Sequence, residues 1–161
     1  MGDPAQKGLN PTDHPVTRAP ESRSRLERAA GALTRGAVAV PGLRRVMLWP
    51  VIARPGYWFA TGCGLIWGGI LSRFRLRSRG GVIVAKGVPS WAFGRGGTTI
   101  GAVFLTGNKT SEAVLEHEAV HRAQWKKYGL ALIPLYVAAG SNPLTNRFEV
   151  EAGLKKGGYT R

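Results

Sequence analysis

The segment from Ser111 to Gly129 constrains the fold most, because its residues specify one helix and give that helix an unusual face. Thr110 or Ser111 can cap it, Glu112 suits its first turn, and Gly129 suits its end. At 100° per residue, two histidines lie on the apolar face and a glutamate lies at its margin. Burying these titratable groups without partners costs several kcal/mol, so this face needs a partner for them.

The three polar residues of this face, His117, Glu118 and His121, form the pattern HExxH. Residues four apart in a helix lie one turn apart on the same face, so two imidazole nitrogens can bind one Zn²⁺ at about 2.0–2.1 Å. The glutamate then lies toward the open coordination position, where its carboxylate can accept a proton from a metal-activated water. The alternative interpretation of an inward histidine is a hydrogen-bonded core residue, and this short pattern also occurs by chance.

A second helix is predicted over the run SNPLTNRFEVEAGLKKGG, with Asn142 as its cap, Pro143 in its first position and Gly157 at its end. Glu149 and Glu151 lie on this helix and point to nearly opposite faces, so only one of them can face the first helix. Small side chains flank Glu149, which permits close approach, whereas larger and charged side chains flank Glu151. We therefore expect Glu149 to be the third metal ligand and Glu151 to be a solvated or ion-paired surface residue.

Together these residues resemble the gluzincins, metallopeptidases with HExxH on one helix and a glutamate ligand on the next, and especially the minimal forms called minigluzincins. The integral-membrane CAAX-prenyl-protease type carries Glu-x-x-Ala-Asp on its second helix, which EVEAG matches at Glu149 and Ala152 and not at Gly153. In that family the aspartate supports a ligand histidine, so Gly153 predicts a less basic ligand and less efficient catalysis. The resemblance covers roughly residues 96–157.

The resemblance implies an α+β fold with a minimal zincin-like domain over residues 80–161, built from short strands, the HExxH helix and the glutamate-bearing second helix. It also implies a zinc-dependent metallopeptidase that hydrolyses peptide bonds in a peptide or protein substrate. Zn²⁺ would be held by His117, His121 and Glu149. Glu118 would take a proton from the metal-activated water and pass it to the leaving amine.

Two extended runs are predicted before the metal helix, Val82–Ala85 and Thr98–Thr106, with a glycine-rich turn between them. In gluzincins the strand before the metal helix lines the cleft and pairs with extended substrate, which would give residues 98–106 that role. Tyr136 and Tyr159 are candidates for stabilising the oxyanion, although packing is the stronger interpretation for each.

Residues 46–79 form an apolar, arginine-flanked segment. The stretch from Pro55 to Ser72 has no charged residue for 18 positions, about the shortest length that spans a bilayer. Its five glycines dilute its hydrophobicity, so a membrane-associated segment and a buried core helix both remain open. Four arginines follow it, and by the positive-inside rule they would hold its C-terminal end in the cytoplasm. The C-terminal domain is expected to be cytoplasmic in either case, with an anionic membrane surface as a candidate partner.

The net charge of +14 is concentrated in the middle of the chain, because no acidic residue lies between Glu27 and Glu112. Residues 1–45 are predicted to be a basic region, and residues 1 to about 22 are typical of a disordered tail. A helix is predicted to begin near Ser24 and to end at Pro41. A single cysteine, Cys63, excludes an internal disulfide and a four-thiolate iron-sulfur cluster.

Two other classes of protein remain as alternatives to a metallopeptidase. The first is a non-catalytic metal-binding or membrane-associated scaffold that keeps a degenerate zincin fold. The second is a basic nucleic-acid-binding protein, which the arginines and the five tryptophans would allow. Nucleic acid is the weaker choice, because the sequence contains no recognised nucleic-acid motif and its basic run adjoins the longest apolar segment.

Overall fold

The computed structural model describes residues 49–92 and 96–159, together with the single positions 32, 36 and 42. The predicted disordered tail lies outside these residues, as does the predicted helix near Ser24 apart from positions 32 and 36. The described elements confirm an α+β architecture with one four-stranded sheet. They are α3 (Pro50–Leu71), β1 (Leu76–Arg79), β2 (Val82–Lys86), a 3-10 turn η1 (Ser90–Ala92), β3 (Gly97–Ile100), β4 (Val103–Thr106), α4 (Glu112–Tyr128), a second 3-10 turn η2 (Gly129–Ala131), α5 (Leu132–Ala139) and α6 (Arg147–Ala152).

The sheet has the strand order β1-β2-β4-β3, with β2 and β4 parallel and the other pairs antiparallel. Gly80 and Gly81 form the tight turn between β1 and β2, and both have positive φ angles, as hairpin turns of this length require. The predicted single run Thr98–Thr106 is wrong, because the chain reverses within it to form the β3–β4 hairpin. Gly101 turns the chain with a φ of 61°, and a side chain there would lie 2.4 Å from the backbone nitrogen of Thr61.

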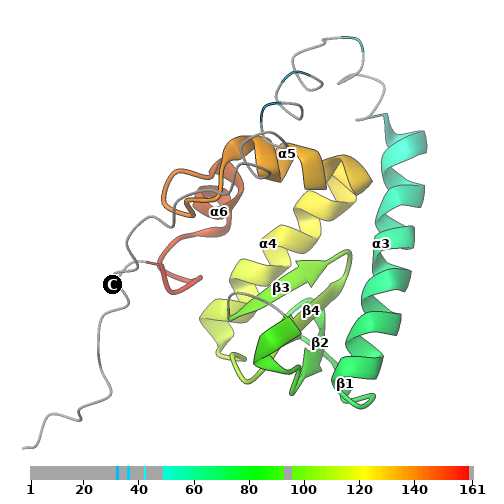
Figure 1. Ribbon diagram of the computed structural model, residues 1–161, viewed down its shortest axis with the longest axis vertical. Helices are drawn as coiled ribbons and strands as arrows, with labels where there is room; N and C mark the ends of the chain where they lie inside the picture. Colours follow the sequence, from blue (N-terminus) through cyan, green and yellow to red (C-terminus); the bar gives the residue numbers. More distant parts are fainter. Residues whose placement is uncertain (1–31, 33–35, 37–41, 43–48, 93–95, 160–161) are drawn as a thin grey trace, which may run out of the picture.

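Both faces of the sheet are covered by helices (Figure 1). Val84 and Phe104 pack with Leu115 of α4 on one face, whereas Ala85 and Leu105 pack with leucines of α3 on the other face. Because neighbouring residues of a strand point to opposite faces, this alternation places the sheet between the two helices. The short central strands are therefore buried on both sides and are almost entirely apolar.

Helix α3 approaches the rest of the fold through small residues. A side chain at Gly56 would lie 2.8 Å from the backbone nitrogen of Leu130, and one at Gly64 would lie 2.8 Å from the carbonyl oxygen of Ile100. One face of α3 therefore belongs to the protein core. Within the described part of the chain, no helix has both the length and the hydrophobicity needed to cross a bilayer.

Helix α4 forms where the sequence predicts it. The Ser111 hydroxyl accepts a hydrogen bond from the Val114 amide, Glu112 lies in the first turn and Gly129 ends the helix. Arg122, in the middle of α4, donates to the Tyr57 hydroxyl of α3 at 3.1 Å. It also donates to the carbonyl of Gly81 in the β1–β2 turn. These contacts fix the face that α4 presents to its neighbours.

The predicted boundaries of the second helix are wrong at both ends. Helix α6 begins after Asn146, whose side chain accepts a hydrogen bond from the Phe148 amide, and it ends at Gly153, which has a φ of 94°. Asn146 is buried, and its amide also donates to the carbonyls of Tyr136 and Gly140. Because this network fixes Asn146 as the cap, the run that begins at Asn142 forms a turn before the helix.

Candidate metal centre

Helices α4 and α6 bring two imidazoles and one carboxylate to a single point. His117 and His121 lie one turn apart on α4, with their Nε2 atoms 3.0 Å apart. Glu149 of α6 places Oε2 3.3 Å from Nε2 of His117 and 3.6 Å from Nε2 of His121. The three ligand atoms all lie within 4.8 Å of one another. The structure therefore brings together the three residues that the sequence predicts as ligands.

The outer nitrogen of each imidazole contacts an oxygen that only accepts hydrogen bonds. Nδ1 of His117 lies 3.1 Å from the carbonyl oxygen of Gly153, and Nδ1 of His121 lies 2.8 Å from Oε1 of Gln124. Each neutral ring must therefore carry its hydrogen on Nδ1, which leaves the lone pair of Nε2 directed at the other two ligand atoms. Metal-binding histidines have this arrangement, with a partner that fixes the tautomer and the ring orientation.

The orientation of the Gln124 amide is itself fixed. Gln124 is buried, and its Nε2 donates to the carbonyl of Phe148 and to Oε2 of Glu151, each at 3.0 Å. Because both contacts require a donor, the amide oxygen must face His121. Glu151 is exposed, as predicted, and it contacts this amide rather than either histidine.

The donor atoms of the cluster fit a metal cation. Among the residues that the structure describes, no donor makes a hydrogen bond to Oε2 of Glu149, although this atom is buried. Leaving a buried carboxylate oxygen without a partner is costly. Two imidazole lone pairs and this oxygen converge, and a cation would satisfy all three.

When no cation is bound, the charges around the centre favour a proton on His121. Burial lowers the pKa of His121, but the carboxylates of Glu149 and Glu118 outweigh it and raise the pKa above its ordinary value. Burial in turn raises the pKa of Glu149, but its contacts with the two histidines and Tyr136 hold the pKa below its usual range. The Glu149 carboxylate is therefore ionised, as a metal ligand must be.

Glu118 lies on the side of the cluster that faces the sheet. Its Oε2 accepts a hydrogen bond of 2.7 Å from the Thr99 hydroxyl of β3. Burial raises the pKa of Glu118 above its ordinary value, although His121 and the Thr99 hydroxyl act in the opposite direction. A buried carboxylate with a raised pKa is suited to accept and return a proton.

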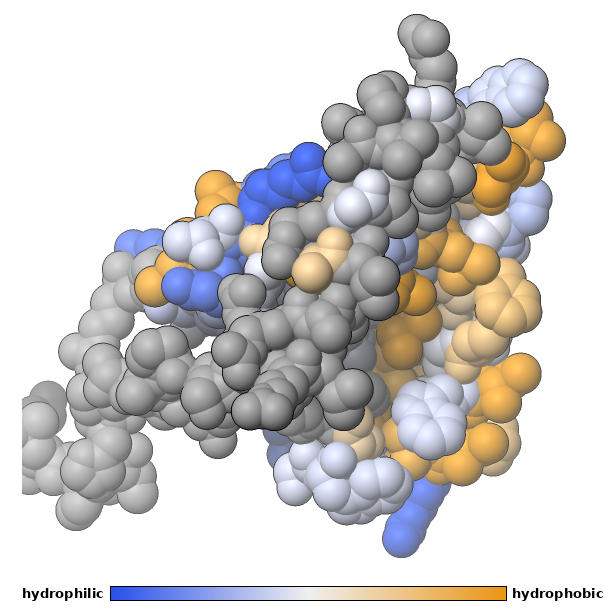
Figure 2. All heavy atoms as spheres, turned by 45° about the horizontal axis from the view of Figure 1, so that its top comes forward, coloured by the Kyte–Doolittle hydropathy of each residue, from blue (hydrophilic) through white to orange (hydrophobic). Residues whose placement is uncertain are grey.

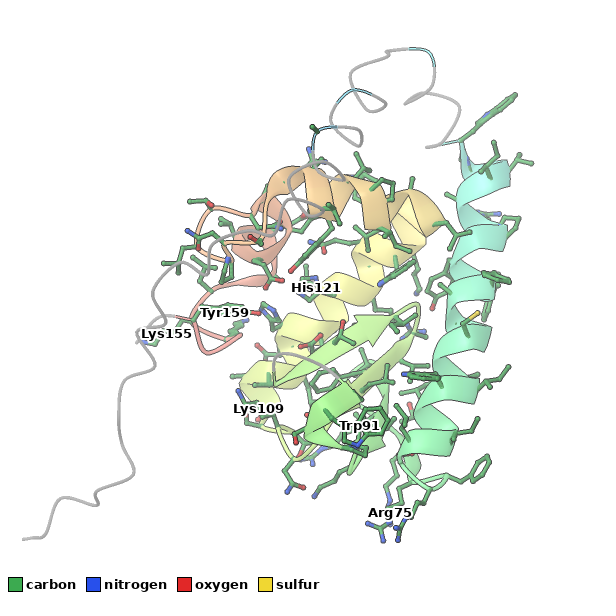
Figure 3. All side chains as sticks on the ribbon, viewed as in Figure 1. Arg75, Trp91, Lys109, His121, Lys155 and Tyr159 are labelled. Carbon is green, nitrogen blue, oxygen red and sulfur yellow. The ribbon has the colours of Figure 1, made fainter. Side chains whose placement is uncertain are left out.

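Two tyrosines lie beside the centre. Tyr136 of α5 donates its hydroxyl hydrogen to Oε1 of Glu149, and its ring stacks on Phe148. The Tyr136 hydroxyl therefore holds the Glu149 carboxylate in place. The ring of Tyr159 lies 6.0 Å from the ring of His117. Figure 3 shows Tyr159 on the turn after α6, on the side of α4 that carries His121.

Several residues of the centre were not identified from the sequence. The sequence could have identified Gln124 as a partner of His121, because it follows His121 by three residues and so lies on the same helical face. Thr99 was harder to identify from the sequence, because its hydroxyl reaches α4 only through the register of the β3–β4 hairpin. The contact made by the Gly153 carbonyl gave no signal in the sequence, because every residue carries a backbone carbonyl. Gly153 lies at the position where the resemblance predicts an aspartate, and its carbonyl oxygen lies 3.1 Å from Nδ1 of His117.

Comparison of the chain with protein-family models, with curated proteins and with solved structures gave no match. The chemistry assigned to this centre therefore rests on its own geometry.

Proposed function

We propose that His117, His121 and Glu149 bind a zinc ion and that the protein hydrolyses peptide bonds at this centre. One observation carries the proposal: two imidazoles, each with its Nδ1 hydrogen engaged, direct their Nε2 lone pairs at a buried carboxylate oxygen. A pair of neutral core histidines would not account for this convergence, because neither Nε2 atom then has a hydrogen to share. The competing occupant is a proton on His121, which the measurement of bound zinc distinguishes from a metal.

Two nitrogen ligands and one carboxylate oxygen are a common donor set for catalytic zinc, and three protein ligands leave a fourth position for substrate or water. Zinc bound there would supply a Lewis acid for hydrolysis. Calcium and magnesium are less suitable, because both prefer sites made of oxygen atoms.

The remaining steps belong to the chain itself. Glu118 would accept a proton from the attacking water and deliver it to the leaving amine, with the Thr99 hydroxyl fixing the carboxylate in position. An extended substrate could approach along β3, the edge strand beside Glu118. The Thr99 carbonyl already accepts a hydrogen bond of 2.8 Å from Trp125 Nε1, so other backbone groups of β3 would have to pair with substrate.

The test measures zinc per chain by elemental analysis after gel filtration, together with cleavage of a denatured protein substrate. Wild-type protein should carry one zinc per chain, and H117A, H121A and E149Q should each lose it. E118Q should keep zinc and lose hydrolysis, because it removes the proton acceptor and leaves the three ligands. E151Q is the matched control for E149Q and should keep zinc. Wild-type protein without a stoichiometric transition metal would refute the proposal.

A structural metal site in a non-catalytic scaffold is the second candidate, and burial favours it. Only 2% of His117 and 3% of Glu149 are exposed, and the ring of Tyr159 lies beside His117. Structural zinc sites are closed in this way, whereas catalytic sites keep an open position. Stoichiometric zinc in wild type and E118Q, with no hydrolysis of peptides by either protein, would identify a scaffold.

A further inference from the structure

Helix α3 presents most of its large apolar side chains to the outside and mainly small residues, together with Tyr57, to the core. Its buried residues include Gly56, Ala60, Gly64 and Gly68. Its outward residues are mostly large and apolar, and between 47% and 67% of each of the following is exposed: Ile52, Trp58, Phe59, Ile66, Trp67 and Ile70. We call these six residues the α3 outer face. Figure 2 shows hydrophobic side chains gathered along this side of the molecule.

Rotation of the helix cannot bury this face. A side chain at Gly68 would lie 3.0 Å from Cβ of Ala85, and one at Gly56 would lie 2.8 Å from the backbone of Leu130. Tryptophan and isoleucine therefore cannot take the places of the glycines against the sheet and η2. A contiguous apolar surface of this kind marks a site of interaction in a stable protein.

A hollow lies beside the N-terminal half of the outer face, between α3 and η2. A depression of about 440 Å³ is lined by Val51, Ile52, Pro55 and Phe59 of α3 and by Tyr128 and Leu130. Its lining is apolar, and its size lies within the range of small-molecule pockets, about 300–1,000 Å³. The hollow therefore suits an apolar chain better than a charged ligand.

The charges beside the outer face are all positive. Arg54 is the one charged residue within α3, and the exposed Arg73 and Arg75 follow the end of the helix. Arg77 and Arg79 pair with Val84 and Val82 in the β1–β2 hairpin and so lie on the side of the sheet that faces α4. No acidic residue occurs anywhere in residues 49–92. Phe74, between two of these arginines, is 79% exposed, and Trp49 at the other end of α3 is 63% exposed. Tryptophan and phenylalanine beside arginine are typical of surfaces that lie in the headgroup region of a membrane.

We propose that the α3 outer face docks the protein on a membrane containing anionic lipids. Helix α3 would lie in the plane of the interface with its six apolar side chains among the lipids and with Arg54, Arg73 and Arg75 on the anionic headgroups. Its inner face stays packed on the sheet, so the helix need not cross the bilayer. Helices α3 and α6 lie on opposite sides of α4 (Figure 1), so docking would leave the metal centre facing away from the lipid.

The test is flotation of the full chain with lipid vesicles, made either of phosphatidylcholine alone or with added phosphatidylglycerol. Wild-type protein should float with the phosphatidylglycerol vesicles, and high salt should weaken this binding because the arginine contacts are screened. W58S/W67S should weaken binding roughly tenfold or more. R73Q/R75Q should remove the preference for phosphatidylglycerol.

Two matched variants control for loss of apolar surface and loss of charge away from α3. L144S/V150S removes two half-exposed apolar side chains, and K109Q/K155Q removes two exposed positive charges that lie on the other side of the molecule (Figure 3). Both should bind vesicles as the wild type does. Circular dichroism melting of each variant shows that it is folded.

Three results would overturn the proposal. The first is a failure of the wild-type chain to bind either kind of vesicle. The second is vesicle binding by W58S/W67S equal to that of the wild type. The third is a dimer in sedimentation that W58S/W67S dissociates, because a second copy of the chain would then occupy the outer face. None of these results depends on zinc or on hydrolysis, so the membrane proposal and the proposed function fail separately.

Discussion

At the scale of single residues, the Gln124 amide determines how His121 faces the centre. Removing it in Q124A takes away the acceptor of the His121 Nδ1 hydrogen, so the imidazole loses its fixed tautomer and orientation. We expect zinc affinity to fall about 10- to 100-fold, the usual effect of losing such a partner. A competition titration against a chromophoric chelator measures this affinity.

The neighbouring E151Q variant is the control for Q124A. Gln124 would keep its hydrogen bond to the Phe148 carbonyl in this variant, so the amide should keep its orientation and zinc affinity should be unchanged. Equal affinity in Q124A and wild type would show that Gln124 does not position the ligand.

The sequence was sufficient to choose between Glu149 and Glu151. Helical periodicity puts them on opposite faces, and the small neighbours of Glu149 indicated which face approaches α4. The structure places Glu149, and not Glu151, beside both histidines. The expected weakness at Gly153 could not be judged from side chains alone, because it is the backbone carbonyl of Gly153 that contacts Nδ1 of His117. Side-chain identity carries no information about contacts that the backbone makes.

At the scale of elements, local signals predicted α4 correctly and failed for α6. The cap and end of α4 are set by residues within the helix and its flanks. The start of α6 is set by Asn146, whose amide hydrogen bonds reach back to Tyr136 and Gly140. Asn142 and Asn146 are equally good caps by type, so tertiary contacts decide between them. The β3–β4 hairpin was missed because Gly101 is a single glycine inside an otherwise extended pattern.

The turn after α6 also shapes the centre, and Gly157 is its closest point. Its amide donates to the Gly153 carbonyl at 3.0 Å, and a side chain there would lie 2.7 Å from Cε1 of His117. G157A should therefore push the turn away from His117 and weaken zinc binding. G62A is the control, because a side chain at Gly62 meets no atom within 4 Å in the described structure. Equal zinc affinity in G157A and G62A would show that the turn moves without disturbing the imidazole.

At the scale of the whole molecule, α3 joins the C-terminal half in one hydrophobic core. Tyr57 and Ala60 of α3 pack with Trp125 and Leu132, and Phe148 of α6 belongs to the same cluster. The ligand helices α4 and α6 therefore meet over the same apolar cluster that holds α3. The sequence left a membrane segment and a core helix both open for α3, because one face of the helix is made of residues that pack in the core and the other is apolar and exposed.

This shared core predicts that metal binding stabilises the entire fold. The cluster joins α4 to α6, and a bound metal would be absent from the unfolded chain, so its binding free energy adds to the free energy of unfolding. At a free zinc concentration about 100 times the Kd, the added stability is about 2.7 kcal/mol, which corresponds to a rise in Tm of roughly 10 °C. Removing zinc from wild-type protein with a chelator should lower Tm by this amount, and returning zinc should restore it.

Two variants make this measurement specific to the centre. H117A should melt at the same temperature with and without chelator, because it has no site to empty. W58S/W67S should still show the full chelator-dependent shift, because its changes lie on the exposed side of α3. A wild-type Tm that does not change when its zinc is removed would contradict the prediction. It would mean that the α4–α6 packing and the hydrogen bonds of Gln124, Tyr136 and Asn146 hold the empty site together unaided.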